Sequence, residues 1–462
     1  MISHDVLTAM LPEHLLLLGI VLLLVIEIAG RWPRAALYVA LASVAAAALA
    51  AASLSASGYA AAPFAGQFSV DPSSLIAKAM VLALALPVLL MSRDDFAEGG
   101  EFALLLLSSL YGVCLMQSAD SFLTLFLGLE IMSMPVYVLV LLAYRRPQSA
   151  EAALKYLVLG GTASASFLMG VSLLYGGSGS MATASFAQAL GSTNTMAHAA
   201  TVLVVLAFFL KGAIVPFHAW APDAYEGASV PVTAYMATIV KAAVILAVVR
   251  LFGSAKVSTP MLELLAVLPL ISIVWGNLTA MRQESLRRMI AYSSIAHAGY
   301  LFYALLGDPA GRLQAVAFYL LAYGVLNLLV FAALPAAADD RERDRLDNLK
   351  GLFHRSPFAA LMIAMAMLSL AGIPPFPGFV AKFLIFKNVM AAGYTTYAVL
   401  GLVGSYLGIY FYLRVIQFMF MSPDAAVAPD TQPRRLALTA SLICLAAATW
   451  VSVFPGWVIS LF

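Results

Sequence analysis

Charged residues are scarce in this sequence. Asp, Glu, Lys and Arg make up 10% of the 462 residues, whereas 63% are hydrophobic and the mean hydropathy is +0.95. A soluble domain of this length would need far more polar surface, so the composition excludes a soluble globular protein. The formal net charge of +2 gives no indication of nucleic-acid binding.

Cysteine is almost absent, and histidine is sparse. The two cysteines, Cys114 and Cys444, stand alone in apolar segments and form no CxxC pair, which supports neither iron–sulfur ligation nor a disulfide framework. The six histidines are scattered singly, so a haem or zinc site is not expected. A Gly-rich dinucleotide fingerprint is also missing. We therefore predict that this chain itself binds no cofactor and no metal.

Long apolar segments dominate what is present. A helix needs about 20 apolar residues to cross a bilayer, and such segments recur along the whole sequence. The first lacks the basic leader and small-residue cleavage site of a secretory signal, so we interpret it as a mature span. The sequence predicts an all-α polytopic membrane protein with fourteen spans, near residues 14–30, 35–55, 71–91, 101–118, 121–143, 151–175, 198–221, 229–250, 260–281, 286–306, 312–336, 357–386, 394–419 and 436–460.

The positive charges indicate how these spans are oriented. If the N-terminus lies outside, 16 of the 25 Lys and Arg residues fall in inside loops and four fall in outside loops. This asymmetry satisfies the positive-inside rule. It predicts that both termini face the periplasm and that the loop from Arg341 to Arg355 faces the cytoplasm.

The remaining five basic residues are all lysines within the spans, namely Lys78, Lys155, Lys211, Lys241 and Lys382. A desolvated lysine can release its proton, whereas arginine stays charged almost unconditionally. Only one acid, Glu130, is predicted to lie deep in a span. The choice of lysine over arginine therefore favours groups that change their charge.

The ionisable residues differ in how deep they lie within their predicted spans. Glu130, Lys211 and Lys241 fall near the middle of their spans, where a charge costs at least about 2.5 kcal/mol on the insertion scale. We interpret the three as functional, with a purely structural Glu–Lys pair as the alternative. Lys78 and Lys155 lie nearer span ends, from which an ammonium group could reach the interface.

A short proline motif occurs twice. IVPFHAW at 214–220 and IPPFPGF at 373–379 align with Pro216 opposite Pro375, and each copy lies close to a lysine. Five spans separate the two copies, so the second runs through the membrane in the opposite sense. Inverted repeats with broken helices are typical of ion-transport folds. We predict two inverted five-helix repeats, 99–255 and 256–421, after an N-terminal three-span segment, 1–98, and before a last span, 422–462.

Four sequence segments are similar to those of a known family. LKGAIVPFHAWAPDAYEGASVPVTAYMATIVKAA, SLAGIPPFPGFVAKFLIFKN, AYSSIAHAGY and ALKYLVLGG resemble the antiporter-like proton-pumping subunits of respiratory complex I and Mrp-type antiporters. The resemblance covers about residues 70–420. Lys382, fourteen spans and the lack of a long C-terminal extension are most similar to the N-type subunit of bacterial NADH:quinone oxidoreductase. The M-type subunit usually has glutamate at the position of Lys382, and the L-type continues into a long lateral helix.

The resemblance implies a proton path and a role for each matching residue. Glu130 and Lys211 would form the first pair, Lys241 the central relay and Lys382 the group that passes the proton outward. His297 would link Lys241 to Lys382, and Lys155 would support the path. His218, near the helix break, would support the proton path mainly through a structural role. The helix breaks would lie at Pro216, Pro374 and Pro375, and Asp223 and Glu226 would make helix-end or loop contacts.

The resemblance also implies an assembly. NADH, FMN, iron–sulfur clusters and quinone would be bound by other subunits of the complex, so no redox chemistry is expected in this chain. Its neighbours would be the K-type and M-type membrane subunits, within the bacterial inner (cytoplasmic) membrane. Two alternatives remain open, an Mrp-type cation/proton antiporter subunit and a membrane subunit of a related hydrogenase or dehydrogenase complex. A scaffold without pumping activity is disfavoured because all the ionisable positions of the family are present.

Overall fold

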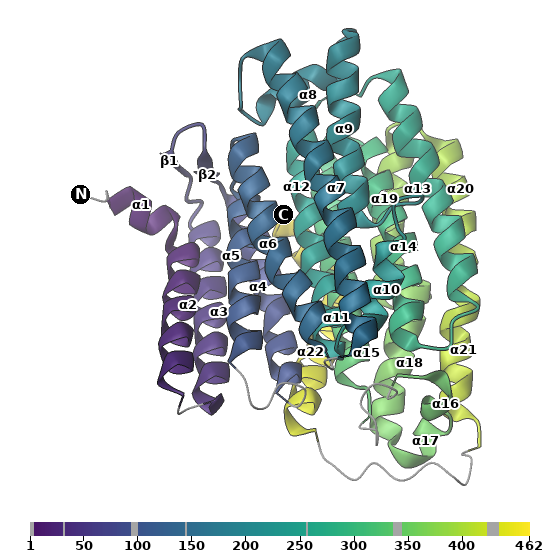
Figure 1. Ribbon diagram of the computed structural model, residues 1–462. Helices are drawn as coiled ribbons and strands as arrows, with labels where there is room; N and C mark the ends of the chain where they lie inside the picture. The colour runs from purple at the N-terminus through teal and green to yellow at the C-terminus, as the bar shows by residue number, and fades with distance from the viewer. Residues whose placement is uncertain are drawn as a thin grey trace.

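The computed structural model describes residues 4–30, 33–93, 100–143, 146–255, 257–335, 344–422 and 434–462. Long helices run side by side through the molecule, and their connections gather at its two ends (Figure 1). Of the loop predicted from Arg341 to Arg355, residues 341–343 lie outside the described part of the chain.

The N-terminal part of the chain contains six helices and the small sheet. The helices are α1 (His4–Ala9), α2 (Leu11–Ala29), α3 (Pro33–Ala56), α4 (Pro72–Ser92), α5 (Glu101–Gln117) and α6 (Phe122–Leu142). Strands β1 (Ala61–Phe64) and β2 (Phe68–Val70) form an antiparallel hairpin between α3 and α4. This hairpin is an addition to the predicted all-helical fold.

The middle of the chain forms α7 (Pro147–Ser178), α8 (Ala184–Leu190), α9 (Thr195–Gly212), α10 (Trp220–Gly227), α11 (Val230–Tyr235), the π-helical turn η2 (Met236–Val240) and α12 (Lys241–Phe252). The C-terminal part forms α13 (Thr259–Ala280), α14 (Leu286–Tyr303), the 3-10 turn η3 (Ala304–Leu306), α15 (Pro309–Ala332), α16 (Leu346–Leu349), α17 (Leu352–Arg355), α18 (Pro357–Ala371), α19 (Pro377–Ala391), α20 (Thr395–Tyr406), α21 (Ile409–Phe420), α22 (Arg435–Val453) and α23 (Pro455–Ser460).

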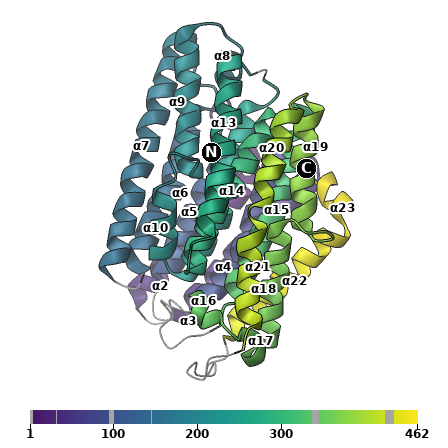
Figure 2. The ribbon, with the colours of Figure 1, turned by 90° about the vertical axis from the view of Figure 1, so that its right-hand side faces the viewer.

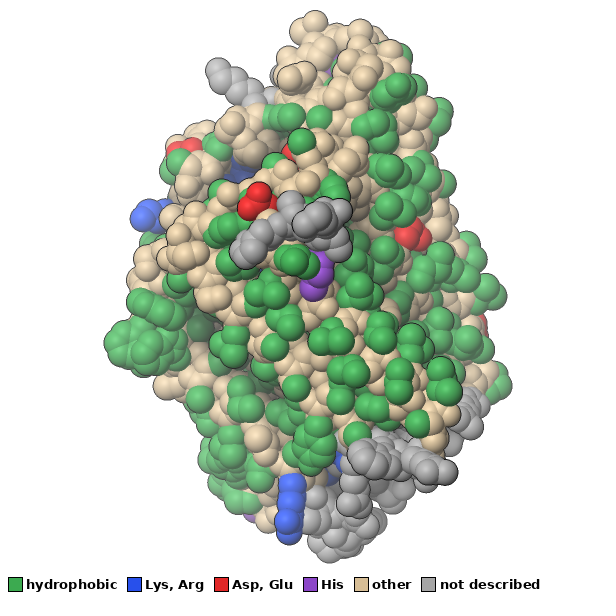
Figure 3. All heavy atoms as spheres, turned by 90° about the vertical axis from the view of Figure 1, so that its left-hand side faces the viewer, with side chains coloured by type: hydrophobic (Ala, Val, Ile, Leu, Met, Phe, Trp, Pro, Cys, Tyr) green, Lys and Arg blue, Asp and Glu red, His purple; other side chains and the backbone are tan. Residues whose placement is uncertain are grey.

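The helices account for the predicted spans. Within the described residues, twelve helical segments are long and apolar enough to cross a membrane, and α5 and α18 are shorter apolar helices. Helices are expected because backbone groups in lipid must satisfy their hydrogen bonds within the segment. Figure 3 shows the face on the side of α2 and α3, where hydrophobic side chains cover the middle and charged ones are few. Ile28 of α2 is 85% exposed, as expected for a side chain that faces lipid.

Both predicted helix breaks are present, and their backbones match. Ala213 after α9 and Gly372 after α18 adopt left-handed conformations, with φ of 59° and 87°. This conformation commonly ends a helix. The next residue donates back to the helix in each case, from Ile214 N to Phe209 O at 2.9 Å and from Ile373 N to Leu368 O at 3.2 Å. The Val215–Pro216 and Pro374–Pro375 bonds are both cis. The two motifs therefore align residue by residue.

The two broken helices run in opposite directions. In Figure 1, α9 lies above α10, whereas α18 lies below α19. The chain thus descends through the first break and rises through the second. This is the inversion that the repeated motif predicts, whereas the exact repeat boundaries at 99–255 and 256–421 stay a prediction.

The centre of the molecule is formed by α11, η2, α12, α14 and α15. The segment Val230–Phe252 is buried throughout, and α14 and α15 are almost completely buried. Figure 2 shows α14 between the blue and teal helices of the first half and the green and yellow helices of the second half. The interior face of α14 can therefore contact groups from both halves.

Candidate functional site

Glu130 of α6 and Lys211 of α9 come together as predicted. Lys211 Nζ lies 3.6 Å from Glu130 Oε1, and the two side chains are 7% and 20% exposed. Lys211 also donates to Ser133 Oγ at 3.0 Å and to Tyr137 OH at 3.4 Å. Glu130 accepts a short hydrogen bond from Ser164 Oγ of α7. Lys211 stands in the last turn of α9, where the helix dipole favours a cation.

Lys241 follows the π-helical turn η2 directly. Its Nζ donates to Ser294 O at 2.5 Å and to Ser294 Oγ in α14. Ser294 Oγ is also 3.3 Å from Tyr225 OH of α10. Single π turns inside α-helices occur frequently at functional sites. Within the described residues no carboxylate pairs with Lys241, so its ammonium group depends on one serine residue.

His297 connects its own helix, α14, to two others. Its Nε2 lies 2.9 Å from Tyr412 OH of α21, and its Nδ1 lies 2.6 Å from Tyr319 OH of α15. Tyr412 OH is also 2.6 Å from Ser293 Oγ. The imidazole therefore has a hydroxyl partner at each nitrogen and can accept from one while donating to the other.

Lys382 lies on α19, and its side chain reaches back to the break between α18 and α19. Its Nζ donates to Ala371 O and to Ser405 Oγ of α20, both at 3.0 Å, and lies 5.4 Å from the centroid of the Tyr300 ring. Ala371 is the last residue of α18, and a carbonyl at a helix end has no partner within the helix. Gly372, at φ 87°, turns the chain beside the lysine and leaves room for its aliphatic part.

Glu130, Lys211, Lys241, His297 and Lys382 are called the row below. Two of the predicted supporting residues lie outside it. Lys155 is 45% exposed and forms ion pairs with Glu151 and Asp223, each at 2.7 Å. Asp223 also pairs with Arg288 at 2.9 Å, in agreement with the predicted helix-end role for this acid. His218 is half-buried, and its Nε2 accepts from Trp275 Nε1 of α13 at 3.2 Å. The predicted roles of Lys155 and His218 in the path stay predictions.

The expectation for Lys78 is wrong. Its side chain is 0% exposed instead of reaching the interface, and its Nζ lies 2.6 Å from Glu13 Oε1 of α2. Glu13 is buried together with Lys78, although it stands in the first turn of α2 and therefore near the end of that span. The ring of Phe68 in β2 lies 4.9 Å from Lys78 Nζ. The hairpin covers this end of α4, which explains why the ammonium group does not reach the surface.

The sequence analysis missed most of the hydroxyl partners. Ser133 and Tyr137 follow Glu130 by three and seven residues, which places them on one face of α6. Ser293 and Ser294 lie one turn before His297, inside the segment AYSSIAHAGY. Helical spacing from each ionisable residue could have identified these candidates, but not the partner on the facing helix. Within the described residues, no cluster of three or more His, Cys, Asp or Glu side chains could hold a metal ion.

The comparisons with known proteins identify the family. Residues 119–408 match the family described as "NADH:quinone oxidoreductase/Mrp antiporter, TM". Over 92% of its length, the chain is 39% identical to NADH-quinone oxidoreductase subunit N of Pelobacter propionicus, of which 91% is covered. This chain belongs to that family. Subunit N of Desulfitobacterium hafniense is 36% identical, with 84% of both chains covered.

Solved structures show the same fold as this member of the family. A chain of respiratory complex I from Thermus thermophilus with bound aureothin has a TM-score of 0.83 and 35% identity, with 97% of this chain and 98% of that chain covered. A chain of the Mrp complex from Dietzia sp. has a TM-score of 0.83 at 23% identity, with 98% and 96% covered. A chain of an archaeal membrane-bound sulfane sulfur reductase has a TM-score of 0.86 at 24% identity, with 98% and 95% covered. The last two likenesses concern the fold alone.

Proposed function

We propose that this chain is the N-type subunit of NADH:quinone oxidoreductase and translocates protons through the membrane arm of that complex. The observation that carries the proposal is the 39% identity to a subunit N over nearly the whole chain. The row of Glu130, Lys211, Lys241, His297 and Lys382 through the middle of the fold supports it.

The proposed mechanism is electrostatic coupling along the row. Lys211 has a carboxylate partner, whereas Lys241 and Lys382 are held by neutral oxygens alone among the described residues. A lysine charge inside a membrane protein is expensive unless it is paired. A push from a neighbouring subunit that separates Glu130 from Lys211 would make the Lys211 ammonium costly. The proton would then move toward Lys241, His297 and Lys382, and each transfer would alter the field at the next group.

The finer features of the assembly follow from the same proposal. The redox groups NADH, FMN, iron–sulfur clusters and quinone are bound by other subunits, and this chain binds no cofactor of its own. Its neighbours are the K-type and M-type subunits in the bacterial inner membrane. Copurification from native membranes with those subunits is the expected result. Isolation with Mrp subunits only would favour the antiporter alternative, which the shared fold leaves open.

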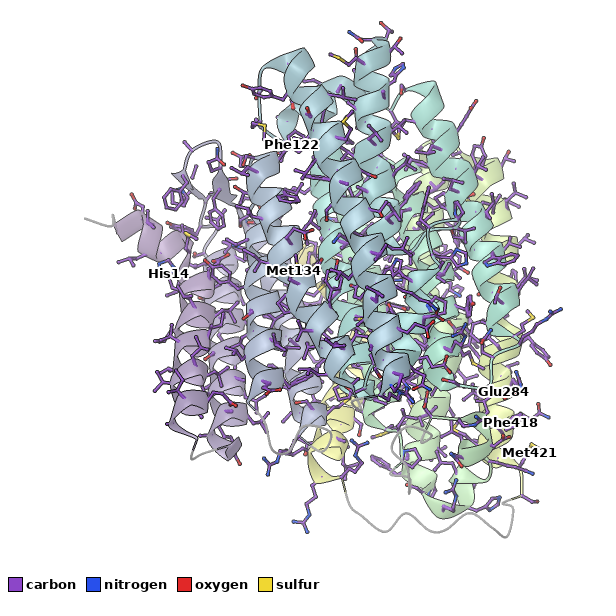
Figure 4. All side chains as sticks on the ribbon, viewed as in Figure 1. His14, Phe122, Met134, Glu284, Phe418 and Met421 are labelled. Atoms are coloured by element: carbon purple, nitrogen blue, oxygen red, sulfur yellow. The ribbon has the colours of Figure 1, made fainter. Side chains whose placement is uncertain are left out.

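The proposed topology places both termini in the periplasm. Both chain ends lie toward the upper side in Figure 1, whereas Glu284, beside the basic residues Arg282 and Arg287, lies at the lower end in Figure 4. Single cysteines in place of Thr193 and Glu151, both exposed, test this orientation because the native cysteines are buried. A membrane-impermeant thiol reagent added from the periplasm should label the Thr193→Cys variant only. Labelling of Glu151→Cys from that side would contradict the topology.

The central test removes the charges of the row. Glu130→Ala and Lys241→Ala should each strongly reduce proton pumping driven by NADH oxidation in vesicles, while the complex still assembles. Lys387→Ala is the matched control, since Lys387 lies on α19 with an exposed side chain. Pumping is compared per amount of assembled complex. If activity falls only in proportion to lost assembly, the Glu–Lys groups are structural and the proposal is wrong.

A further inference from the structure

The row of polar contacts is interrupted at α14. On one side, Lys241 contacts Ser294, which contacts Tyr225. On the other side, Ser293 contacts Tyr412, which contacts His297. Consecutive residues of an α-helix point about 100° apart, so Ser293 and Ser294 face different partners. The described hydrogen bonds do not connect the two groups.

Tyr323 of α15 stands at this interruption. Its side chain is 3% exposed, and its ring centroid lies 4.6 Å from that of His297. Its hydroxyl lies within reach of the Ser294 and Asn327 side chains, and it is close enough to Tyr412 for their charges to interact. Neither side-chain contact meets the full geometry of a hydrogen bond. Tyr323 therefore places a buried hydroxyl with only loose contacts between the two groups.

Asn327 offers this hydroxyl a resting acceptor. Asn327 lies one turn after Tyr323, and its Nδ2 donates to Tyr323 O at 2.8 Å. That bond fixes the orientation of the amide, and Asn327 Oδ1 also lacks a partner among the described residues. A buried hydroxyl and a buried acceptor left unbonded are unfavourable. The Tyr323 hydroxyl, held loosely beside a proton path, can therefore turn between Asn327 Oδ1 and other acceptors.

We propose that the Tyr323 hydroxyl relays protons between Lys241 with Ser294 and Tyr412 with His297. This inference rests on the proposed proton-translocating function and adds the residue that joins its two halves. In each transfer the Tyr323 oxygen receives a proton from the Ser294 side and releases its own proton toward Tyr412. One O–H bond forms as one breaks, so the tyrosine is neutral before and after. The hydroxyl then rotates back toward Ser294.

Tyr323→Phe tests the relay in the intact complex. Phenylalanine keeps the ring against His297 and removes only the hydroxyl, with its loose contacts to Ser294 and Asn327. We expect pumping per assembled complex to fall at least about 100-fold, the lower end of what a positioned proton-transfer group contributes. Tyr303→Phe is the matched control, because the Tyr303 hydroxyl is likewise buried without a partner among the described residues, but its ring lies beside Gly401 of α20. This variant should pump normally.

Three results would overturn parts of the reasoning, and they can be told apart. Normal pumping in Tyr323→Phe together with lost pumping in Lys241→Ala would reject the relay and leave the proposed function intact. Normal pumping in both variants would reject the proposed function itself. An equal loss in Tyr323→Phe and Tyr303→Phe would show a general effect of removing buried hydroxyls, and the relay would again be rejected.

Discussion

The buried pair of Glu13 and Lys78 offers a quantitative test of what such contacts contribute to stability. It joins α2 to α4, with Nζ and Oε1 2.6 Å apart and the two side chains 1% and 0% exposed. Within the described residues neither group has any other hydrogen-bond partner. Both charges have therefore left water with each other as their main compensation, to which the Phe68 ring adds a cation–π contact for Lys78. The relevant perturbations are Lys78→Met, Glu13→Leu and the double variant.

The expected changes in stability follow from the burial of the Glu13–Lys78 pair. Removing one partner leaves an uncompensated buried charge, which typically destabilises by about 3–5 kcal/mol. The lower end applies here, because the remaining group can change its protonation state and become neutral. Replacing both partners by apolar residues of similar volume is often neutral or stabilising. We therefore expect the double variant to be at least as stable as the native chain, although each single variant is weaker.

Cys114 of α5 provides the assay. Its thiol is buried and close enough to Glu13 and Lys78 to feel their charges. With Cys444 replaced by alanine, the rate of Cys114 modification reports local opening of the contact between α2, α4 and α5 in the assembled complex. A loss of 3 kcal/mol raises this rate by roughly 100-fold. Each single variant should show such an increase, and the double variant should return to the native rate.

The double variant decides the outcome. If it opens as fast as the worse single variant, or faster, the pair stabilises the fold by more than its desolvation penalty and the reasoning is refuted. Normal pumping in the double variant would agree with a pair that lies outside the proton path.

Two further predictions concern charges near the ends of the helices. Burial raises the pKa of Asp344, but the charge and hydrogen bonds of Arg287, 2.9 Å away, outweigh it and hold the pKa below the usual 3.8. The pair's contribution to stability is thus present above pH 4 and is lost as the pH falls through the folded pKa. The thermal midpoint of unfolding should therefore drop at acid pH in the native chain and should drop less in Asp344→Asn. Lys155→Ala should reduce pumping much less than Lys241→Ala, since the ion pairs of an exposed lysine are screened by water and contribute little. An equal loss in the vesicle assay would place Lys155 on the main route.

The spans and the breaks were predictable because lipid leaves the backbone few options. An apolar run long enough to cross a bilayer must be helical, and a proline inside it frees carbonyls that need other partners. Pro216 and Pro375 therefore located both breaks. The depth of Lys78 was not predictable in the same way. Its position near a span end indicates access to water only if nothing folds over that end, and the hairpin β1–β2 does so.

The lysines of the row were predictable and their partners were not, for an energetic reason. A charge within a span is expensive, so Lys241 stands out in the sequence, whereas serine and tyrosine hydroxyls cost little in a helix and occur in many spans. Helical spacing from His297 makes Ser294 a candidate, but its partners Lys241 and Tyr225 are known only once α14 is packed against α12 and α10. The same holds for Tyr323, which gains meaning only from the ring of His297 beside it.

The three central lysines share a feature that connects fold and site. Lys211 occupies the last turn before the first break, Lys382 donates to the carbonyl of Ala371 that the second break leaves free, and Lys241 follows a π-helical turn. Each ammonium group thus lies where the regular helical hydrogen bonding is interrupted and backbone dipoles can partly compensate its charge. Prolines mark two of these interruptions, but the turn before Lys241 carries no such mark in TAYMATIVK. A side-chain charge at mid-depth is consequently the better indicator of an irregular backbone here than proline itself.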